Sequence, residues 1–379
     1  MALRYDGPIV EAVAVGDRKY NVVGYAFVLI SFIGTMLSEA VGAGPDTFWG
    51  PIYALLVAMP IPIAAFGAFR ARIGHSGWAA VLAFMLIAGT SLRPVLTVCK
   101  NGDLYDINHA IAVTGLLILA ADLLGRRRIW PAAIGLALAV WSRQMTCFYA
   151  IPILWLAWRP QSSPGRSAGQ STTVHSQSTG EAGLGAKVQN PAARSRLSLA
   201  IFGVAMVAAL PMTMSFIKLG NPLDSGYPQL YGDRENQISV DGRTQLWGFR
   251  WYPRHLVAMN ATVPDIDMRN HSIYFDNTDR EGCSIWVSSP ILLAVFLTAG
   301  RWWRDPASRV LMLSSFVVIL GLWGYHTTAS YQAGFYRYSL DFIPIWLMVI
   351  APHVMTKRAT PWTLAAMAWS ALYFHTLTP

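Results

Sequence analysis

LSLAIFGVAMVAALPMTMSF, residues 197–216, carries no charged side chain. An α-helix of roughly 20 apolar residues is long enough to cross the hydrocarbon core of a bilayer. Similar runs recur along the chain, in which 54% of the residues are hydrophobic, 13% are charged and the mean hydropathy is +0.38. This composition excludes an ordinary soluble domain. The sequence therefore predicts an all-α fold, a polytopic bundle of membrane helices.

The other apolar runs extend this prediction over most of the chain. The run at residues 129–158 is longer than one span and is interrupted by Trp141-Ser142-Arg143-Gln144, so we expect two short helices there. In total the sequence predicts about eleven membrane segments. The other candidate spans are residues 21–41, 49–69, 77–98, 110–124, 286–299, 310–325, 340–351 and 362–373.

Basic residues indicate how these spans are oriented. If the spans alternate, the basic side chains next to them fall on one side, which is the positive-inside pattern. We therefore expect a multi-pass integral protein of the plasma (inner) membrane with a cytoplasmic N-terminus and an external C-terminus. The net charge of +9 is then largely topological, and no nucleic-acid-binding module is present. The residues concerned are Arg4, Arg18, Lys19, Arg70, Arg72, Arg126, Arg127, Arg128, Arg159, Arg301, Arg304, Arg309, Lys357 and Arg358.

Two hydrophilic segments divide the chain. Residues 159–196 are rich in Ser, Gly, Gln and Thr, so we expect a disordered cytoplasmic linker there. This linker would separate an N-terminal transmembrane half, residues 1–158, from a C-terminal half, residues 197–379. Within the second half, residues 218–285 form an aromatic, acid-rich block that is too long for a simple connection. We expect this block to lie outside, as short amphipathic helices and turns, with aromatic side chains that anchor at the interface or stack on sugar rings.

The first outside loop contains carboxylates that are candidates for chemistry. Asp46 lies in the loop, and Glu39 is at the end of the preceding apolar run. A carboxylate at the membrane edge is costly and therefore often functional. The alternative is that Asp46 caps the following helix.

The second outside loop, residues 99–109, combines two carboxylates with a histidine. Asp103 and Asp106 are three residues apart and would share one face of a helix. Together with His109 they could hold a divalent cation, and oxygen ligands suit Mg²⁺ or Mn²⁺. The alternative is a solvated turn in which Asp106 or Asn108 caps the helix.

A later outside loop carries Arg337 between Tyr336 and Tyr338. An arginine at this position either extends to the membrane surface or binds a phosphate through two parallel hydrogen bonds. Asp341, four residues further on, is a candidate ion-pair partner. No nucleophile elbow, Walker loop, zinc-protease motif or dinucleotide fingerprint is present, and the three cysteines lack metal spacing.

Several of these segments resemble the polytopic glycosyltransferases of the GT-C superfamily, which includes protein mannosyltransferases, oligosaccharyltransferases and aminoarabinose transferases. The resemblance covers most of the chain through short motifs. It rests on Asp46, on Asp103-Leu-Tyr-Asp106, and on residues 135–152, 220–227 and 334–344. One departure is the first outside loop, which is shorter here than in that family.

The resemblance implies an integral-membrane glycosyltransferase that moves a sugar from a polyprenyl-phosphate donor to an external glycan, lipid or protein acceptor. It implies a catalytic role for Asp46, supported by Glu39. It also implies a divalent cation, Mg²⁺ or Mn²⁺, at Asp103 or Asp106. The residues that would bind the donor phosphate are Lys100, Arg337, Tyr338 and Arg93. We expect the three outside loops to converge on one cavity beneath the 218–285 block.

Two other functions compete with this interpretation. A transporter, or a relative without enzymatic activity, would be favoured by charges in the middle of spans, and few are present. A polysaccharide polymerase or ligase would depend on basic loop residues such as Arg250 and Arg254 rather than on a carboxylate.

Overall fold

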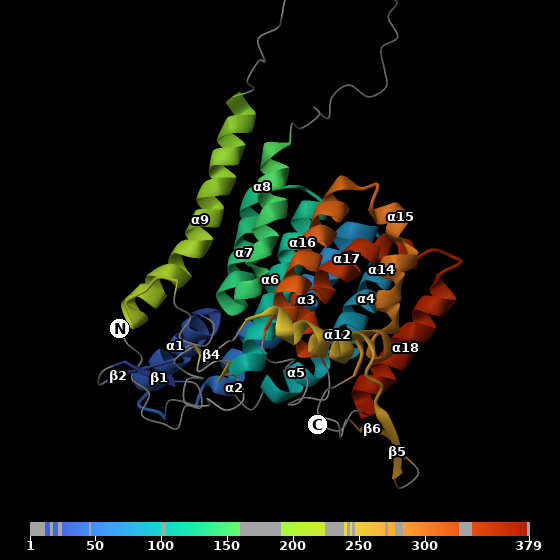
Figure 1. Ribbon diagram of the computed structural model, residues 1–379, viewed down its shortest axis with the longest axis horizontal. Helices are drawn as coiled ribbons and strands as arrows, with labels where there is room; N and C mark the ends of the chain where they lie inside the picture. The colour runs from blue at the N-terminus through green and yellow to red at the C-terminus, as the bar shows by residue number, and fades with distance from the viewer. Residues whose placement is uncertain are drawn as a thin grey trace, which may run out of the picture.

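The computed structural model is a bundle of helices with three small hairpins at one end (Figure 1). The residues that it describes are 12–15, 18–21, 25–44, 47–99, 104–159, 191–223, 239–240, 243–244, 247–269, 272–276, 283–325 and 336–376. The helices of the first half are α1 (Tyr25–Ala40), α2 (Trp49–Tyr53), the π-helix η1 (Ala54–Ala58), α3 (Pro60–Ile73), α4 (Ser76–Ala88), α5 (Leu92–Cys99), α6 (Leu104–Leu124), α7 (Ile129–Ser142), the 3₁₀ helix η2 (Gln144–Tyr149) and α8 (Ala150–Trp158).

The second half begins with α9 and continues through shorter helices. Its helices are α9 (Pro191–Leu219), η3 (Phe249–Trp251), α12 (Tyr252–Asn260), α13 (Ile285–Ser288), η4 (Pro290–Leu293), α14 (Ala294–Leu297), α15 (Ala299–Trp302), α16 (Pro306–Trp323), η5 (Arg337–Asp341), α17 (Ile343–Val354) and α18 (Thr360–Thr376). The antiparallel hairpins are β1–β2 (Ala12–Val15, Arg18–Asn21), β3–β4 (Ser239–Val240, Arg243–Thr244) and β5–β6 (Asp265–Arg269, Ser272–Asp276).

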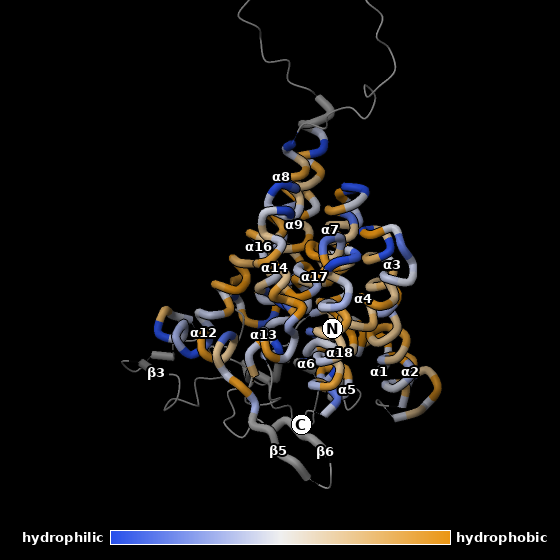
Figure 2. Tube along the Cα trace, turned by 90° about the vertical axis from the view of Figure 1, so that its right-hand side faces the viewer, coloured by the Kyte–Doolittle hydropathy of each residue, from blue (hydrophilic) through white to orange (hydrophobic). Residues whose placement is uncertain are grey.

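Four helices in the described part of the chain are long and apolar enough to cross a membrane: Trp49–Ile73, Asp106–Leu124, Ser195–Leu219 and Pro306–Trp323. These helices indicate a membrane protein, as the sequence predicted, whereas the count of eleven segments stays a prediction. Figure 2 shows hydrophobic stretches along the helices and hydrophilic turns at the end of the bundle where α8 ends. At this end Arg72 lies 3.7 Å from Asp305, which joins the end of α3 to the start of α16.

The centre of the bundle is formed by α6 and α17, which are almost entirely buried. Helices α6 and α7 approach each other closely. A Cβ atom added at Gly115 would lie 2.5 Å from the carbonyl oxygen of Gly135, and one added at Gly135 would lie 2.6 Å from that of Gly115. Small residues permit this kind of backbone contact in membrane bundles. The pair therefore determines how closely α7 approaches α6.

The predicted interruption of residues 129–158 is confirmed. Helix α7 ends at Ser142, Arg143 is extended (φ −139°, ψ 101°), and the chain resumes as η2 and α8. The neighbouring Trp141 donates its indole N–H to the carbonyl of Val207 on α9, at 2.9 Å. Pro211 is four residues after Val207 and has no N–H for that carbonyl. The indole therefore replaces the helical hydrogen bond that proline removes.

The expected first span, residues 21–41, conflicts with the structure. The Tyr25 hydroxyl is 3.0 Å from that of Ser215, and the Lys218 ammonium lies 5.1 Å from the centre of the Tyr25 ring. The start of α1 thus lies beside the end of α9, although the sequence-based topology placed them on opposite sides. Helix α1 is about 24 Å long at 1.5 Å per residue, shorter than the hydrocarbon core of a bilayer, and it is not one of the candidate spans.

Two other expected spans are broken. Residues 77–98 form α4 and α5, which are separated at Gly89, and residues 286–299 form the short pieces α13, η4 and α14. The second break falls at Ser289-Pro290, where proline removes a backbone donor.

The described part of the chain is predominantly helical, as the all-α prediction requires, and three short hairpins are added to the helices. Two of these hairpins lie in the block where helices and turns were expected. Helix α9 begins at Pro191, inside the segment assigned to the linker. Residues 160–190 of that linker lie outside the described residues.

Candidate functional site

A largely buried cluster of ionisable side chains lies where three segments meet. Asp106 and His109 come from the first turns of α6, and Arg143 comes from the interruption between α7 and η2. Arg337 and Asp341 come from η5. Asp106, His109, Arg337 and Asp341 are all buried, and Asp341 is fully enclosed, with 0% of its surface exposed. These segments are far apart in the sequence, so only the tertiary fold brings them together.

Two ion pairs cross the cluster. Arg143 contacts Asp341 with both edges of its guanidinium group, through Nε to Oδ1 at 3.2 Å and Nη2 to Oδ2 at 3.1 Å. Arg337 places Nη1 at 3.4 Å from Oδ1 of Asp106. The proposed pairing of Arg337 with Asp341 is therefore not the one observed. In a 3₁₀ helix, residues four apart point about a third of a turn away from each other, so η5 directs these two side chains to different partners.

Other side chains fix the geometry around Asp341. The Nδ1 atom of His109 lies 3.6 Å from Oδ1 of Asp341. Tyr149 donates its hydroxyl hydrogen to the Asp341 backbone carbonyl at 3.0 Å. The guanidinium carbon of Arg143 is 4.9 Å from the centre of the Tyr338 ring, a cation–π distance. This enclosure leaves the Arg143 guanidinium little freedom to change its orientation.

His255 links α12 of the outer block to this cluster. Its Nε2 is 2.8 Å from the backbone carbonyl of Tyr325, which can only accept, so Nε2 carries the hydrogen. Nδ1 then accepts from the Tyr336 hydroxyl at 3.0 Å. Burial lowers the pKa of His255 to about 4, and nearby Arg254 lowers it further against the opposing carbonyl bond. Burial raises the pKa of the Tyr336 hydroxyl well above its ordinary value. The contact is thus between two neutral groups, next to Arg337.

The structure brings only some of the predicted site residues together. Asp106, Arg337 and Tyr338 all belong to the cluster. Glu39 is exposed on α1 and takes no part in the ion pairs described above. Asp46, Lys100 and Asp103 lie outside the described residues.

Arg93 contacts the C-terminal helix α18. It donates to the backbone carbonyl of Phe374, and its Nη2 is 2.6 Å from Nδ1 of His375. These contacts tie α5 to the end of α18. Phosphate binding by Arg93 stays a prediction.

The described residues around Asp106 do not fit a divalent cation. Within the described part of the chain, no three His, Cys, Asp or Glu side chains are grouped so that they could hold a metal ion. The guanidinium of Arg337 next to Asp106 would also repel a cation. Asp106 is in the first turn of α6 rather than at its N-cap. In the first turn its negative charge interacts favourably with the helix dipole.

Sequence reasoning missed Arg143 as a site residue, together with His109 as a neighbour of Asp341 and His255 as a link to the outer block. The sequence could have identified Arg143, because this residue interrupts an otherwise apolar stretch and such charges are costly in a membrane. No sequence pattern identifies His255, since its partners Tyr325 and Tyr336 are distant in sequence.

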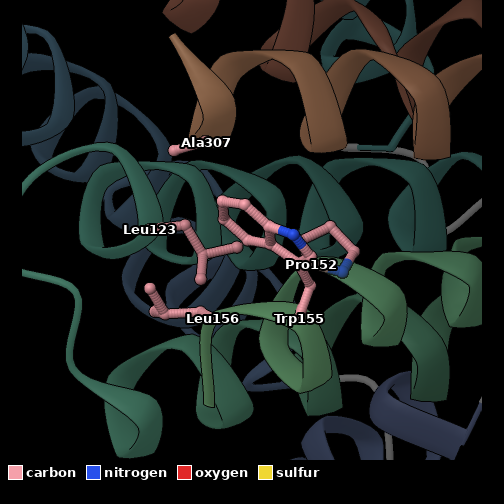
Figure 3. A pocket seen from close by; sticks show the side chains of 5 residues that line it. All are labelled: Leu123, Pro152, Trp155, Leu156 and Ala307. Carbon is pink, nitrogen blue, oxygen red and sulfur yellow. The ribbon is translucent and has the colours of Figure 1, made fainter. Parts of the chain in front are cut away.

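The pocket in Figure 3 is not part of this cluster. It is lined by Leu123, Pro152, Trp155, Leu156 and Ala307. Leu123 is near the end of α6 opposite to Asp106, and none of the five side chains carries a charge. This pocket therefore offers nothing that would bind a phosphate.

No protein-family model matches the chain, and neither a curated protein nor a solved structure matches it.

Proposed function

We propose that the protein is an integral-membrane glycosyltransferase, which transfers a sugar from a polyprenyl-phosphate donor to an extracytoplasmic acceptor. The observation that carries the proposal is the convergence of Arg143, Arg337 and Tyr338 next to α12 of the outer block. Two guanidinium groups at a membrane edge suit a phosphate whose lipid stays in the bilayer.

The chemistry needs stabilisation of a leaving phosphate. The bond between the anomeric carbon and the phosphate oxygen breaks, and its electron pair stays on the phosphate. Fixed guanidinium donors stabilise that charge as it develops. The acceptor hydroxyl or amine forms the new bond to the anomeric carbon and gives its proton to a carboxylate, for which Asp46 remains the proposed base. No step is assigned to a metal ion.

The proposal places the cluster on the external side of the plasma membrane. The positive-inside pattern supports this orientation, because the basic ends of α3 and α16 lie together and away from the cluster. The contact of Tyr25 with Ser215 supports an external location for the start of α1 as well. This replaces the expectation that the chain before α1 is cytoplasmic.

A donor assay tests the proposal. Purified protein in liposomes receives sugars linked to undecaprenyl phosphate, and the release of undecaprenyl phosphate is measured with and without acceptors. Arg337→Lys and Arg143→Lys should each lower release about 10²-fold, because a lysine cannot form the two parallel bonds. Arg128→Lys is the matched control, since Arg128 is more than half exposed and pairs with Asp122 at the other end of α6.

The control should behave like the wild-type protein, and the thermal stability of each variant reports on folding. No release from any donor, or full release by Arg337→Lys, would refute the proposal.

A membrane protein without enzymatic activity is the second candidate. One observation favours it: each arginine of the cluster is already neutralised by a carboxylate, as in a purely structural ion pair. In that case the arginine variants would lose thermal stability and the wild-type protein would release no phosphate.

A further inference from the structure

A series of aromatic rings connects the outer surface to the charged cluster. The Trp247 ring is 5.0 Å from the Tyr325 ring, and Tyr325 is 6.1 Å from Tyr338. Tyr338 in turn lies 4.9 Å beneath the guanidinium of Arg143. Exposure falls along this path, from 48% for Trp247 to 4% for Tyr338. The first ring of the series is therefore accessible, and the last is part of the proposed phosphate site.

The backbone holds Trp247 in this position. Trp247 and Tyr325 form an isolated antiparallel bridge, and Gly248 donates its N–H to the carbonyl of Gly324 at 2.9 Å. A Cβ atom at Gly324 would lie 3.6 Å from the Trp247 ring, so the indole packs closely on this turn. The large ring is thus presented at the surface with little conformational freedom, which lowers the entropic cost of binding a ligand.

We propose that Trp247, supported by Tyr325, is a stacking platform for a sugar ring of an oligosaccharide substrate. This inference rests on the proposed function and specifies its substrate class. The apolar face of a sugar ring packs well on an indole, and the polar edges of the sugar remain in water. Two rings separate Trp247 from Arg143, so a sugar on Trp247 is not the one attached to the phosphate. The substrate therefore contains at least two sugar residues.

An aromatic residue that only anchors the protein at the bilayer surface would not need this path to the cluster. Phe249 provides the comparison, because it is 86% exposed on the same segment and its ring contacts Tyr252, at 5.4 Å. Phe249→Ala is thus a matched control for Trp247→Ala.

Binding to a glycan array tests the inference. The probe is an array of mono- to hexasaccharides, and the protein is embedded in nanodiscs; the affinity for the strongest ligand is then measured by calorimetry. We expect binding to a saccharide of two or more residues. Trp247→Ala should weaken it about tenfold, Trp247→Phe should weaken it less, and Phe249→Ala should leave it unchanged.

Three results would overturn the inference: no saccharide bound, binding unaffected by Trp247→Ala, or equal losses for Trp247→Ala and Phe249→Ala. The last result would identify a surface anchor. Arg337→Lys separates this inference from the proposed function, since it should lower transfer about 10²-fold and retain saccharide binding. A wild-type protein that binds saccharides without transferring them would contradict the proposed function alone.

Discussion

The hydrogen bond from Trp141 to the Val207 carbonyl makes a prediction about two helices. Pro211 leaves that carbonyl without its helical donor, and the indole supplies the missing hydrogen at 2.9 Å. Trp141→Phe removes the donor and leaves an unsatisfied carbonyl in an apolar environment. In a Pro211→Ala background, the alanine N–H can form the ordinary helical bond, so the same Trp141→Phe change should cost less.

The magnitude follows from the value of one interhelical hydrogen bond. Such bonds contribute about 0.6 kcal/mol on average and up to about 1.7 kcal/mol in membrane proteins. The packing lost when an indole becomes a phenyl ring is common to both backgrounds and cancels in a double-mutant cycle. We therefore expect a coupling free energy between Trp141→Phe and Pro211→Ala of about 0.6–1.7 kcal/mol.

The assay is reversible unfolding in mixed micelles. The wild-type protein, the two single variants and the double variant are titrated with sodium dodecyl sulfate, and the four free energies of unfolding are compared. A coupling below about 0.3 kcal/mol would refute the reasoning, because independent sites add to within that margin. It would mean that the indole does not compensate for the proline.

Three further predictions follow from the packing, the titration of a buried group and the topology. Gly135→Ala should destabilise the protein by about 1–3 kcal/mol in the same assay, because α6 and α7 must separate, while Gly67→Ala, with nothing within 4 Å of the added carbon, should not. The free energy of unfolding should fall as the pH drops from about 6.5 to about 4, since the unfolded chain binds a proton there and folded His255 does not; His255→Gln should reduce that dependence. In sealed cells, an external thiol reagent should label a cysteine at Ser239 and not one at Ser171, and labelling at Ser171 would contradict the orientation.

The parts of the fold that the sequence predicts correctly depend on local composition. Long apolar runs gave the candidate spans, and the polar interruption around Arg143 gave the division between α7 and α8. Both signals are contained within one segment. Composition alone does not separate a spanning helix from one that lies along a surface. The observation that conflicts with the expected first span is a distant contact, which joins Tyr25 of α1 to Ser215, 190 residues away.

The candidate site shows the same division between local and distant information. Arg337 and Asp106 were selected as unusual charges, and the structure pairs them with each other, which the sequence did not predict. Asp106 was expected to bind a cation, and Arg337 was expected to pair with Asp341 four residues on. The observed pair of Arg143 with Asp341 joins residues 198 positions apart. Spacing rules within one helix could not predict this pair, because its two residues come from different segments. The rules also failed for Arg337 and Asp341, because η5 has a 3₁₀ rather than an α-helical period.

The balance of charge in the cluster affects how a donor phosphate would bind there. Two guanidinium groups and two carboxylates carry no net charge together, and this lets Arg337 stay buried and Arg143 mostly covered, since an unpaired buried charge costs several kcal/mol. A phosphate oxygen offers the same acceptor as a carboxylate oxygen, so a donor phosphate would bind by exchange. If it took Arg337 from Asp106, that carboxylate would lose its cationic partner and become a stronger proton acceptor. Donor binding would then free a second carboxylate in the cluster, in addition to the proposed base Asp46. The pairing that stabilises the cluster would thus prepare it for transfer, and the same ion pairs would serve both the fold and the proposed reaction.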